Sequence, residues 1–233
     1  MTHTKKVIQV AGTWLAVASL LMVITFIFHG PIAANPFDQM DSIAEGFIRW
    51  TTVHWIAAVA LSLFIVTGLL VLTARSRLTE GWWTMTAWAV LPVGALWTLI
   101  TAVAEATAVA NAAVSGSREI FQAWWVFSEG MASGFTFVAL AVAVIAGNEI
   151  WSSERVVPVW SAWIAMLAGF ASFAGWAIGM WFGIGFGNLI WLASSLLMTL
   201  WTLWFGVALT QSQANVVTTR RVADMGERQS AAV

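Results

Sequence analysis

Two histidines and two glutamates are the side chains of this 233-residue sequence most able to do chemistry. Each lies inside or at the end of a long apolar run, where ionisable groups are costly and usually serve a function. Imidazole and carboxylate together suit Zn²⁺ or iron. A carboxylate can also hold a neighbouring imidazole protonated, which is the basis of a proton relay. The four candidate metal ligands are His29, His54, Glu105 and Glu129.

Two further polar residues belong to the candidate site. Arg49 precedes His54 by about one helical turn and is a possible ion-pair partner for either glutamate. Asn188 opens the last apolar run. The third histidine of the chain, His3, lies before the first run, so both remaining histidines belong to the candidate set.

Six apolar runs dominate the chain, and a bilayer core of about 30 Å needs about 20 apolar residues of helix to cross it. Hydrophobic residues make up 60% of the sequence and charged residues 9%, which is outside the range of soluble domains. The first run exceeds the length of a signal-peptide core, which favours a retained helix. The runs cover residues 7–28, 50–74, 82–104, 121–147, 156–182 and 186–209.

An open strand cannot satisfy its backbone polar groups in lipid, so each run is predicted to be a helix. The predicted fold class is an all-α, polytopic integral membrane protein with a six-transmembrane-helix bundle. We expect one domain over residues 1–210 and a disordered cytoplasmic tail over 211–233. Residues 30–41 are predicted to be an irregular connection, and the spacing of Ser42 and Glu45 favours a helix start near Ile43. The predicted helices are 7–29, 43–74, 82–110, 120–147, 156–182 and 186–210.

Basic residues predict the orientation of the bundle, because cytoplasmic loops are enriched in Lys and Arg. Eight of the ten basic residues fall before the first run or after the second, fourth and sixth, and only Arg49 and Arg118 fall on the other side. Both termini are therefore predicted to be cytoplasmic in a multi-pass protein of the cell membrane. Most of the 17 tryptophans fall near the ends of runs, as expected of interfacial anchors.

Antiparallel crossings allow depth to be estimated from the rise of about 1.5 Å per helical residue. By this count the two histidines and two glutamates reach the same layer beneath the outer surface, with Asn188 at a similar depth. Polar groups at membrane depth tend to face the bundle interior, where they meet one another. The sequence therefore predicts a His/Glu polar site in the outer leaflet.

Composition narrows the remaining possibilities. The net charge of −1 gives no reason to expect a nucleic-acid partner, and the absence of cysteine excludes disulfides, thiolate metal ligands and a cysteine nucleophile. Small residues at intervals of four form a stripe on the fifth run, suited to close helix packing within the bundle, in a homo-oligomer or with a partner subunit. These residues are Ala171, Gly175, Gly179 and Gly183.

Three functions remain open from the sequence alone. The first is a membrane protein that binds a divalent metal ion (Zn or Fe) through the four ligands, or haem b through His29 and His54, and the sequence does not decide whether catalysis follows. The second is a small proton- or cation-linked transporter or channel subunit, in which Pro92 and Gly94 interrupt the third helix. The third is a scaffold or accessory subunit, whose polar layer only fixes helix register.

Overall fold

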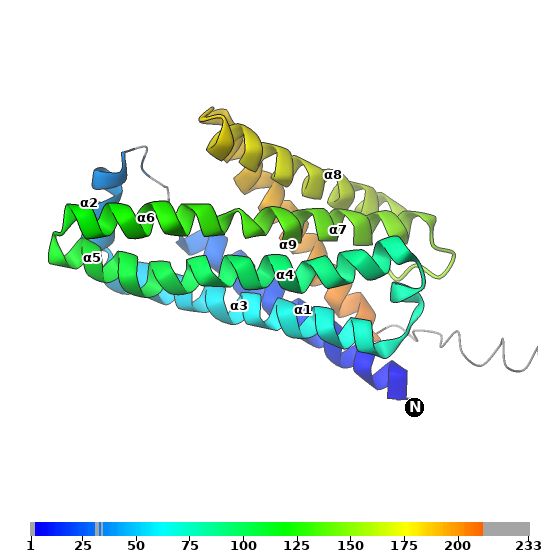
Figure 1. The fold of residues 1–233 in the computed structure, drawn as a ribbon. Helices are drawn as coiled ribbons and strands as arrows, with labels where there is room; N and C mark the ends of the chain where they lie inside the picture. Colours follow the sequence, from blue (N-terminus) through cyan, green and yellow to red (C-terminus); the bar gives the residue numbers. More distant parts are fainter. Residues whose placement is uncertain (1–2, 31–32, 34, 212–233) are drawn as a thin grey trace, which may run out of the picture.

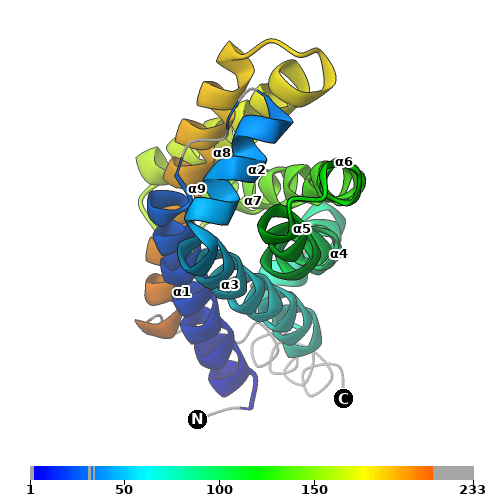
Figure 2. The same ribbon diagram turned by 90° about the vertical axis from the view of Figure 1, so that its left-hand side faces the viewer.

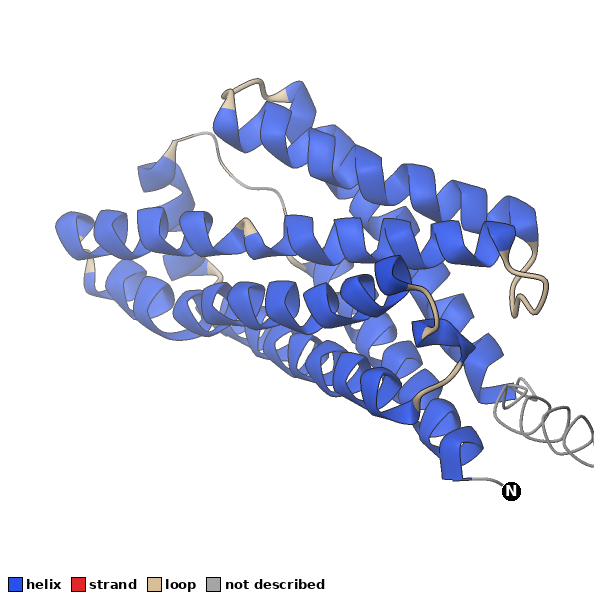
Figure 3. Cartoon of the chain, turned by 45° about the vertical axis from the view of Figure 1, so that its right-hand side comes forward, coloured by secondary structure: helices blue, strands red, loops and turns tan. Residues whose placement is uncertain are grey.

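The computed structural model describes residues 3–30, 33 and 35–211, and this part of the chain is helical, without a strand (Figures 1 and 3). The predicted tail lies outside these residues, except for Gln211. The α-helices are α1 (His3–Phe28), α2 (Pro36–Glu45), α3 (Phe47–Ala74), α4 (Trp82–Ala104), α5 (Ala110–Ser115), α6 (Arg118–Ala132), α7 (Gly134–Trp151), α8 (Val159–Trp176) and α9 (Phe186–Gln211). Two π-helical turns, η2 (Glu105–Val109) and η3 (Ala177–Trp181), and one 3₁₀ turn, η1 (Arg77–Thr79), complete the set.

Six helical segments of the described chain are long and apolar enough to cross a membrane. The all-helical prediction is confirmed, and so is the expectation of six such segments. They are His3–Phe28, Phe47–Ala74, Trp82–Ser115, Arg118–Trp151, Val159–Trp181 and Phe186–Gln211.

The six segments pack in a ring that follows the order of the chain (Figure 2). Helix α3 packs against α1 and α4, α7 packs against α4 and α8, and α9 packs against α8. A contact between α1 and α9 closes the ring. This arrangement lets residues distant in sequence approach one another at each end of the bundle.

Small residues allow close approach where neighbouring helices of the ring meet. A Cβ atom added to Gly12 of α1 would lie 2.7 Å from the Gly206 carbonyl oxygen of α9. A Cβ atom added to Gly68 of α3 would lie 2.7 Å from Cδ of Pro92, which is inside α4. Both pairs of backbones therefore depend on the missing side chain.

Residues 36–41 of the connection predicted to be irregular belong to helix α2, so the prediction is wrong for this half of the connection. Asn35 caps the helix, because its side chain accepts a hydrogen bond from the Phe37 amide at 2.9 Å, and Pro36 occupies the first turn. Proline fits the first turn because its missing N–H would have no helical partner there. Gly46 then separates α2 from α3, so the second long helix begins at Phe47.

A hydrophobic cluster separate from the main core of the bundle lies at the predicted outer end, where α2, α5 and α6 gather (Figure 1). The segments Trp82–Ser115 and Arg118–Trp151 each have 34 residues. That corresponds to about 50 Å of helix, several turns more than a bilayer core of about 30 Å requires. The largest buried side chains of this cluster are Met40, Ile43, Trp50, Phe121 and Trp125.

Candidate functional site

A polar layer lies next to this outer cluster, and its buried members come from three different segments. His54 of α3 is 6% exposed, Glu105 of η2 is 5% exposed and Ser128 of α6 is fully buried. The π-helical turn inserts an extra residue into the helical register at Glu105, and such turns occur frequently at functional sites.

His29 and His54 lie in contact at this layer. Their ring centroids are 5.1 Å apart in an edge-to-face arrangement. The Nδ1 atom of His54 lies 2.8 Å from the Trp50 carbonyl oxygen, and Nδ1 of His29 lies 3.1 Å from the Gly30 carbonyl oxygen. A carbonyl only accepts, so Nδ1 carries the proton in each neutral ring. Each Nε2 then keeps a free lone pair, with no hydrogen-bond partner among the described residues.

Arg49 lies beside His29 rather than in an ion pair with a glutamate. Burial lowers the pKa of the His29 imidazole, the hydrogen bond to Gly30 raises it, and the positive charge of Arg49 lowers it. The net effect is a lowered pKa, so the His29 ring is neutral at pH 7. Between described residues, the one ion pair joins Arg77 and Glu149, so the possible pairing of Arg49 with a glutamate of the site is not found.

We expect Arg49→Gln to raise the pKa of His29, because a positive charge that disfavours imidazolium is removed. The measurement is an NMR titration of the histidine rings, with His29 assigned through His29→Asn. Arg118→Gln is the control, because the Arg118 guanidinium lies over the Phe37 ring, 4.9 Å from its centroid. A His29 pKa that falls or stays unchanged in Arg49→Gln would contradict the electrostatic role of Arg49.

Glu105 is held by Ser128. The Ser128 hydroxyl is hydrogen-bonded to Oε1 of Glu105 and also lies 3.1 Å from the Trp125 carbonyl oxygen. Thr101 fixes the same turn of α6, because its hydroxyl donates to the Ser128 carbonyl at 3.0 Å. The second carboxyl oxygen of Glu105, Oε2, is buried and has no partner of good hydrogen-bond geometry in the described chain.

Glu129 is a neighbour of Glu105 but is less enclosed. Its carboxyl lies next to the side chain of Trp125, one turn earlier on α6, and is close enough for its charge to act on Glu105. No hydrogen bond joins Glu129 to either histidine within the described chain. The two carboxyls and the imidazole pair therefore share the layer without forming one cluster.

Asn188 lies elsewhere. It is exposed at the start of α9 and packs against Gly179 of η3, and no hydrogen bond within the described chain joins it to the His/Glu layer. Gly175 likewise packs against Gly187 and Trp191 of the same chain. Part of the small-residue stripe is thus used between η3, α8 and α9, while a contact of this stripe with a partner remains a prediction.

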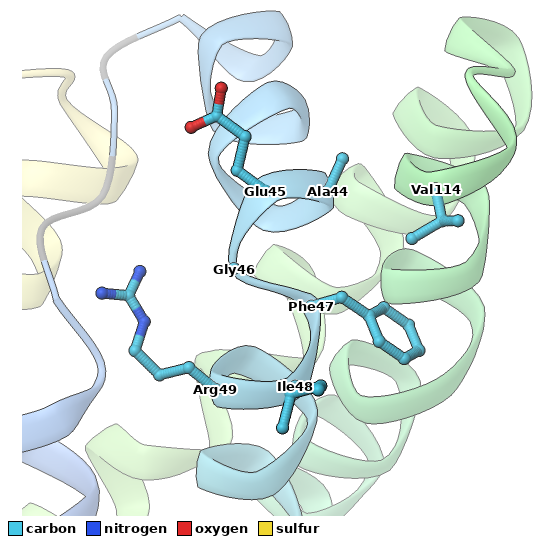
Figure 4. Close-up of a pocket in the computed structure, with 7 residues that line it drawn as sticks. All are labelled: Ala44, Glu45, Gly46, Phe47, Ile48, Arg49 and Val114. Atoms are coloured by element: carbon cyan, nitrogen blue, oxygen red, sulfur yellow. The ribbon is translucent and has the colours of Figure 1, made fainter.

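A shallow depression of about 730 Å³ lies at the junction of α2 and α3 (Figure 4). Glu45 and Arg49 extend to one side of the junction, and Phe47 and Val114 lie on the other. The buried residues of the polar layer are not part of its wall. Its lining is Ala44, Glu45, Gly46, Phe47, Ile48, Arg49 and Val114.

The predicted metal site receives no support. Among the described residues, no group of three or more His, Cys, Asp or Glu side chains is arranged to hold a metal ion. The predicted set His29, His54, Glu105 and Glu129 does not converge, because Glu105 is bonded to Ser128 and the imidazoles face one another and Trp50. The two imidazole rings are in direct edge-to-face contact, so there is also no space for a haem between them.

Comparison of the chain with protein-family models, with curated proteins and with solved structures finds no match. The chemistry of the site therefore rests on its geometry. Two of its residues, Ser128 and Trp50, were not predicted as part of the site. Ser128 directly precedes Glu129 in the sequence, which is the one signal that could have identified it.

Proposed function

We propose that this chain is a multi-pass protein of the cell membrane, with both termini in the cytoplasm and the polar layer on the outer side. The six long apolar helices support insertion in a bilayer. The excess of Lys and Arg in the opposite set of loops supports the orientation.

We propose further that Glu105 is a proton-binding residue, and the hydrogen bonds of Ser128 carry this proposal. The Ser128 hydroxyl has one hydrogen but lies within hydrogen-bond distance of two acceptors, the Trp125 carbonyl and Oε1 of Glu105. Both contacts are satisfied at once when Glu105 is protonated. Glu105 then donates from Oε1 to the Ser128 oxygen, and Ser128 donates to Trp125.

Loss of that proton has a defined consequence. The ionised Glu105 accepts at both oxygens, so the Ser128 hydrogen turns from the Trp125 carbonyl to Oε1. An ionised carboxylate buried among apolar helices is costly, which disfavours permanent ionisation of Glu105. The imidazole pair, which shares the layer with this group, provides two further basic nitrogens, the Nε2 atoms of His29 and His54.

These features favour a small proton-linked transporter or channel subunit over a metal enzyme or a passive scaffold. Glu105 is the residue that takes up and releases the proton, and Ser128 is the residue that positions it. In this proposal the imidazole pair of His29 and His54 provides further proton-binding nitrogens in the same layer.

We expect Glu105→Gln to abolish proton flux through liposomes that contain the purified protein under a pH gradient. Glutamine keeps the shape of the side chain but cannot exchange a proton. Infrared difference spectra between acidic and alkaline buffer should also lose the band of one protonated carboxyl. Glu119→Gln, a change at an exposed position of α6, is the matched control and should retain both signals. Wild-type flux and an unchanged carboxyl band in Glu105→Gln would refute the proposal.

A further inference from the structure

Two buried polar atoms beside the layer lack a hydrogen-bond partner of good geometry in the described chain. They are Nε1 of Trp50 and Oε2 of Glu105. The Trp50 side chain is 4% exposed and lies next to the Glu105 carboxyl. An indole N–H only donates, and a carboxyl oxygen that carries no proton only accepts. Each atom is thus the partner that the other lacks, and buried polar atoms without partners are uncommon enough to need an explanation.

Trp50 also contacts the imidazole pair. Its ring centroid lies 4.9 Å from that of His29 and 4.4 Å from that of His54. Its carbonyl oxygen accepts the hydrogen bond from Nδ1 of His54. Trp50 therefore contacts both histidines and also lies beside Glu105, although the imidazole pair and Glu105 belong to different helical segments.

We propose that Trp50 is a positioning residue that couples proton binding at Glu105 to proton binding at the imidazole pair. This inference rests on the proposed function of Glu105. When Glu105 releases its proton to solvent, charge develops on both carboxyl oxygens, and a hydrogen bond from the indole to Oε2 becomes charge-assisted and stronger. The indole then turns toward η2, which changes its contact with both imidazoles.

The reverse effect follows by linkage. A proton accepted at Nε2 of His29 or His54 creates an imidazolium against the indole, which attracts the face of the ring. That attraction opposes the rotation of the Trp50 indole toward Glu105. The other charges that act on these groups are Arg49, beside His29, and Glu129, beside Glu105.

The experiment uses fluorine NMR of the full-length protein labelled with 5-fluorotryptophan. The Trp50 resonance is the one that disappears in Trp50→Phe, and Trp55→Phe controls for the assignment because Trp55 is a half-exposed residue of the same helix. We expect the Trp50 resonance to shift with pH in step with the carboxyl band of Glu105. In Glu105→Gln, which keeps the indole in place, that shift should be lost.

A second measurement tests the coupling to histidine. Glu105→Gln should move the NMR titration of His54, and the movement should be smaller when the same change is made in Trp50→Phe. A Trp50 resonance that stays fixed while the carboxyl band titrates overturns the coupling and leaves the proposed function standing. A carboxyl band that does not titrate overturns both. An equal movement of the His54 titration with and without the indole also overturns the coupling.

Discussion

Glu149→Gln is expected to lower the free energy of unfolding by about 3–5 kcal/mol, because it leaves the Arg77 guanidinium buried without a counter-charge. Oε1 of Glu149 lies 3.0 Å from Nη1 of Arg77, and the two side chains are 0% and 8% exposed. Oε2 of Glu149 accepts a hydrogen bond from the Val156 amide at 2.7 Å. Glu149 of α7 therefore bonds to Arg77, in the connection after α3, and to Val156, in the connection after α7. Denaturant unfolding in detergent, followed by circular dichroism, measures the loss.

The control for this prediction is Glu154→Gln, at an exposed position a few residues further along. Surface changes of this kind alter stability by about 0.5 kcal/mol or less. Replacing both partners by apolar residues, in Arg77→Met with Glu149→Leu, should recover most of the loss, since no charge remains buried. If Glu149→Gln costs no more than Glu154→Gln, the buried pair does not hold these two connections together.

The common level of these polar residues along the bundle could be predicted from the sequence, because helical rise and alternating direction are enough to estimate it, while their depth in a membrane remains a prediction. His29 and His54 are in contact, and Glu105 and Glu129 are neighbours. The rotation of each helix about its axis could not be predicted in the same way. Asn188 has a similar predicted depth but packs against Gly179.

Glu105 shows why the rotation of a helix about its axis cannot be predicted from a sequence pattern. It begins a π-helical turn, and that turn shifts the register of every residue after it without a proline or glycine to mark it. Ser128 depends on this geometry, since it belongs to the site through its contact with Glu105. Trp50 belongs to the site through Glu105 and through its contacts with both histidines. From the sequence alone, Trp50 is predicted to be an interfacial anchor, because most of the 17 tryptophans fall near the ends of apolar runs.

The Arg77–Glu149 pair was not predicted, for a different reason. Arg77 is one of the eight basic residues whose position predicts the orientation, and Glu149 lies beyond the predicted end of its helix at residue 147. In the structure α7 continues to Trp151, which brings the carboxylate back into the folded bundle. Charged residues at helix ends therefore need a tertiary contact before their role can be assigned.

Gly206→Leu is expected to lower the free energy of unfolding by about 3 kcal/mol, in the upper part of the range for overpacked cores. A Cβ atom at this position would lie 2.6 Å from the Ala16 amide nitrogen and 2.8 Å from the Gly12 carbonyl oxygen. These are backbone atoms, so no side-chain rotation can relieve the contact and α1 must move away from α9. The same movement stretches the 2.8 Å hydrogen bond between the Ser19 and Thr202 hydroxyls.

Gly130→Ala separates the effect of this contact from the effect of losing a glycine. Apart from the nearby backbone of its own helix, no atom of the described residues lies within 4 Å of a Cβ added to Gly130, which is also helical. Alanine there should leave stability unchanged or raise it by up to about 1 kcal/mol through helix propensity. Because α1 and α9 are the first and last helices of the ring, their separation opens the bundle along its whole length. A Gly206→Leu protein as stable as Gly130→Ala would show that the ring does not depend on this closing contact.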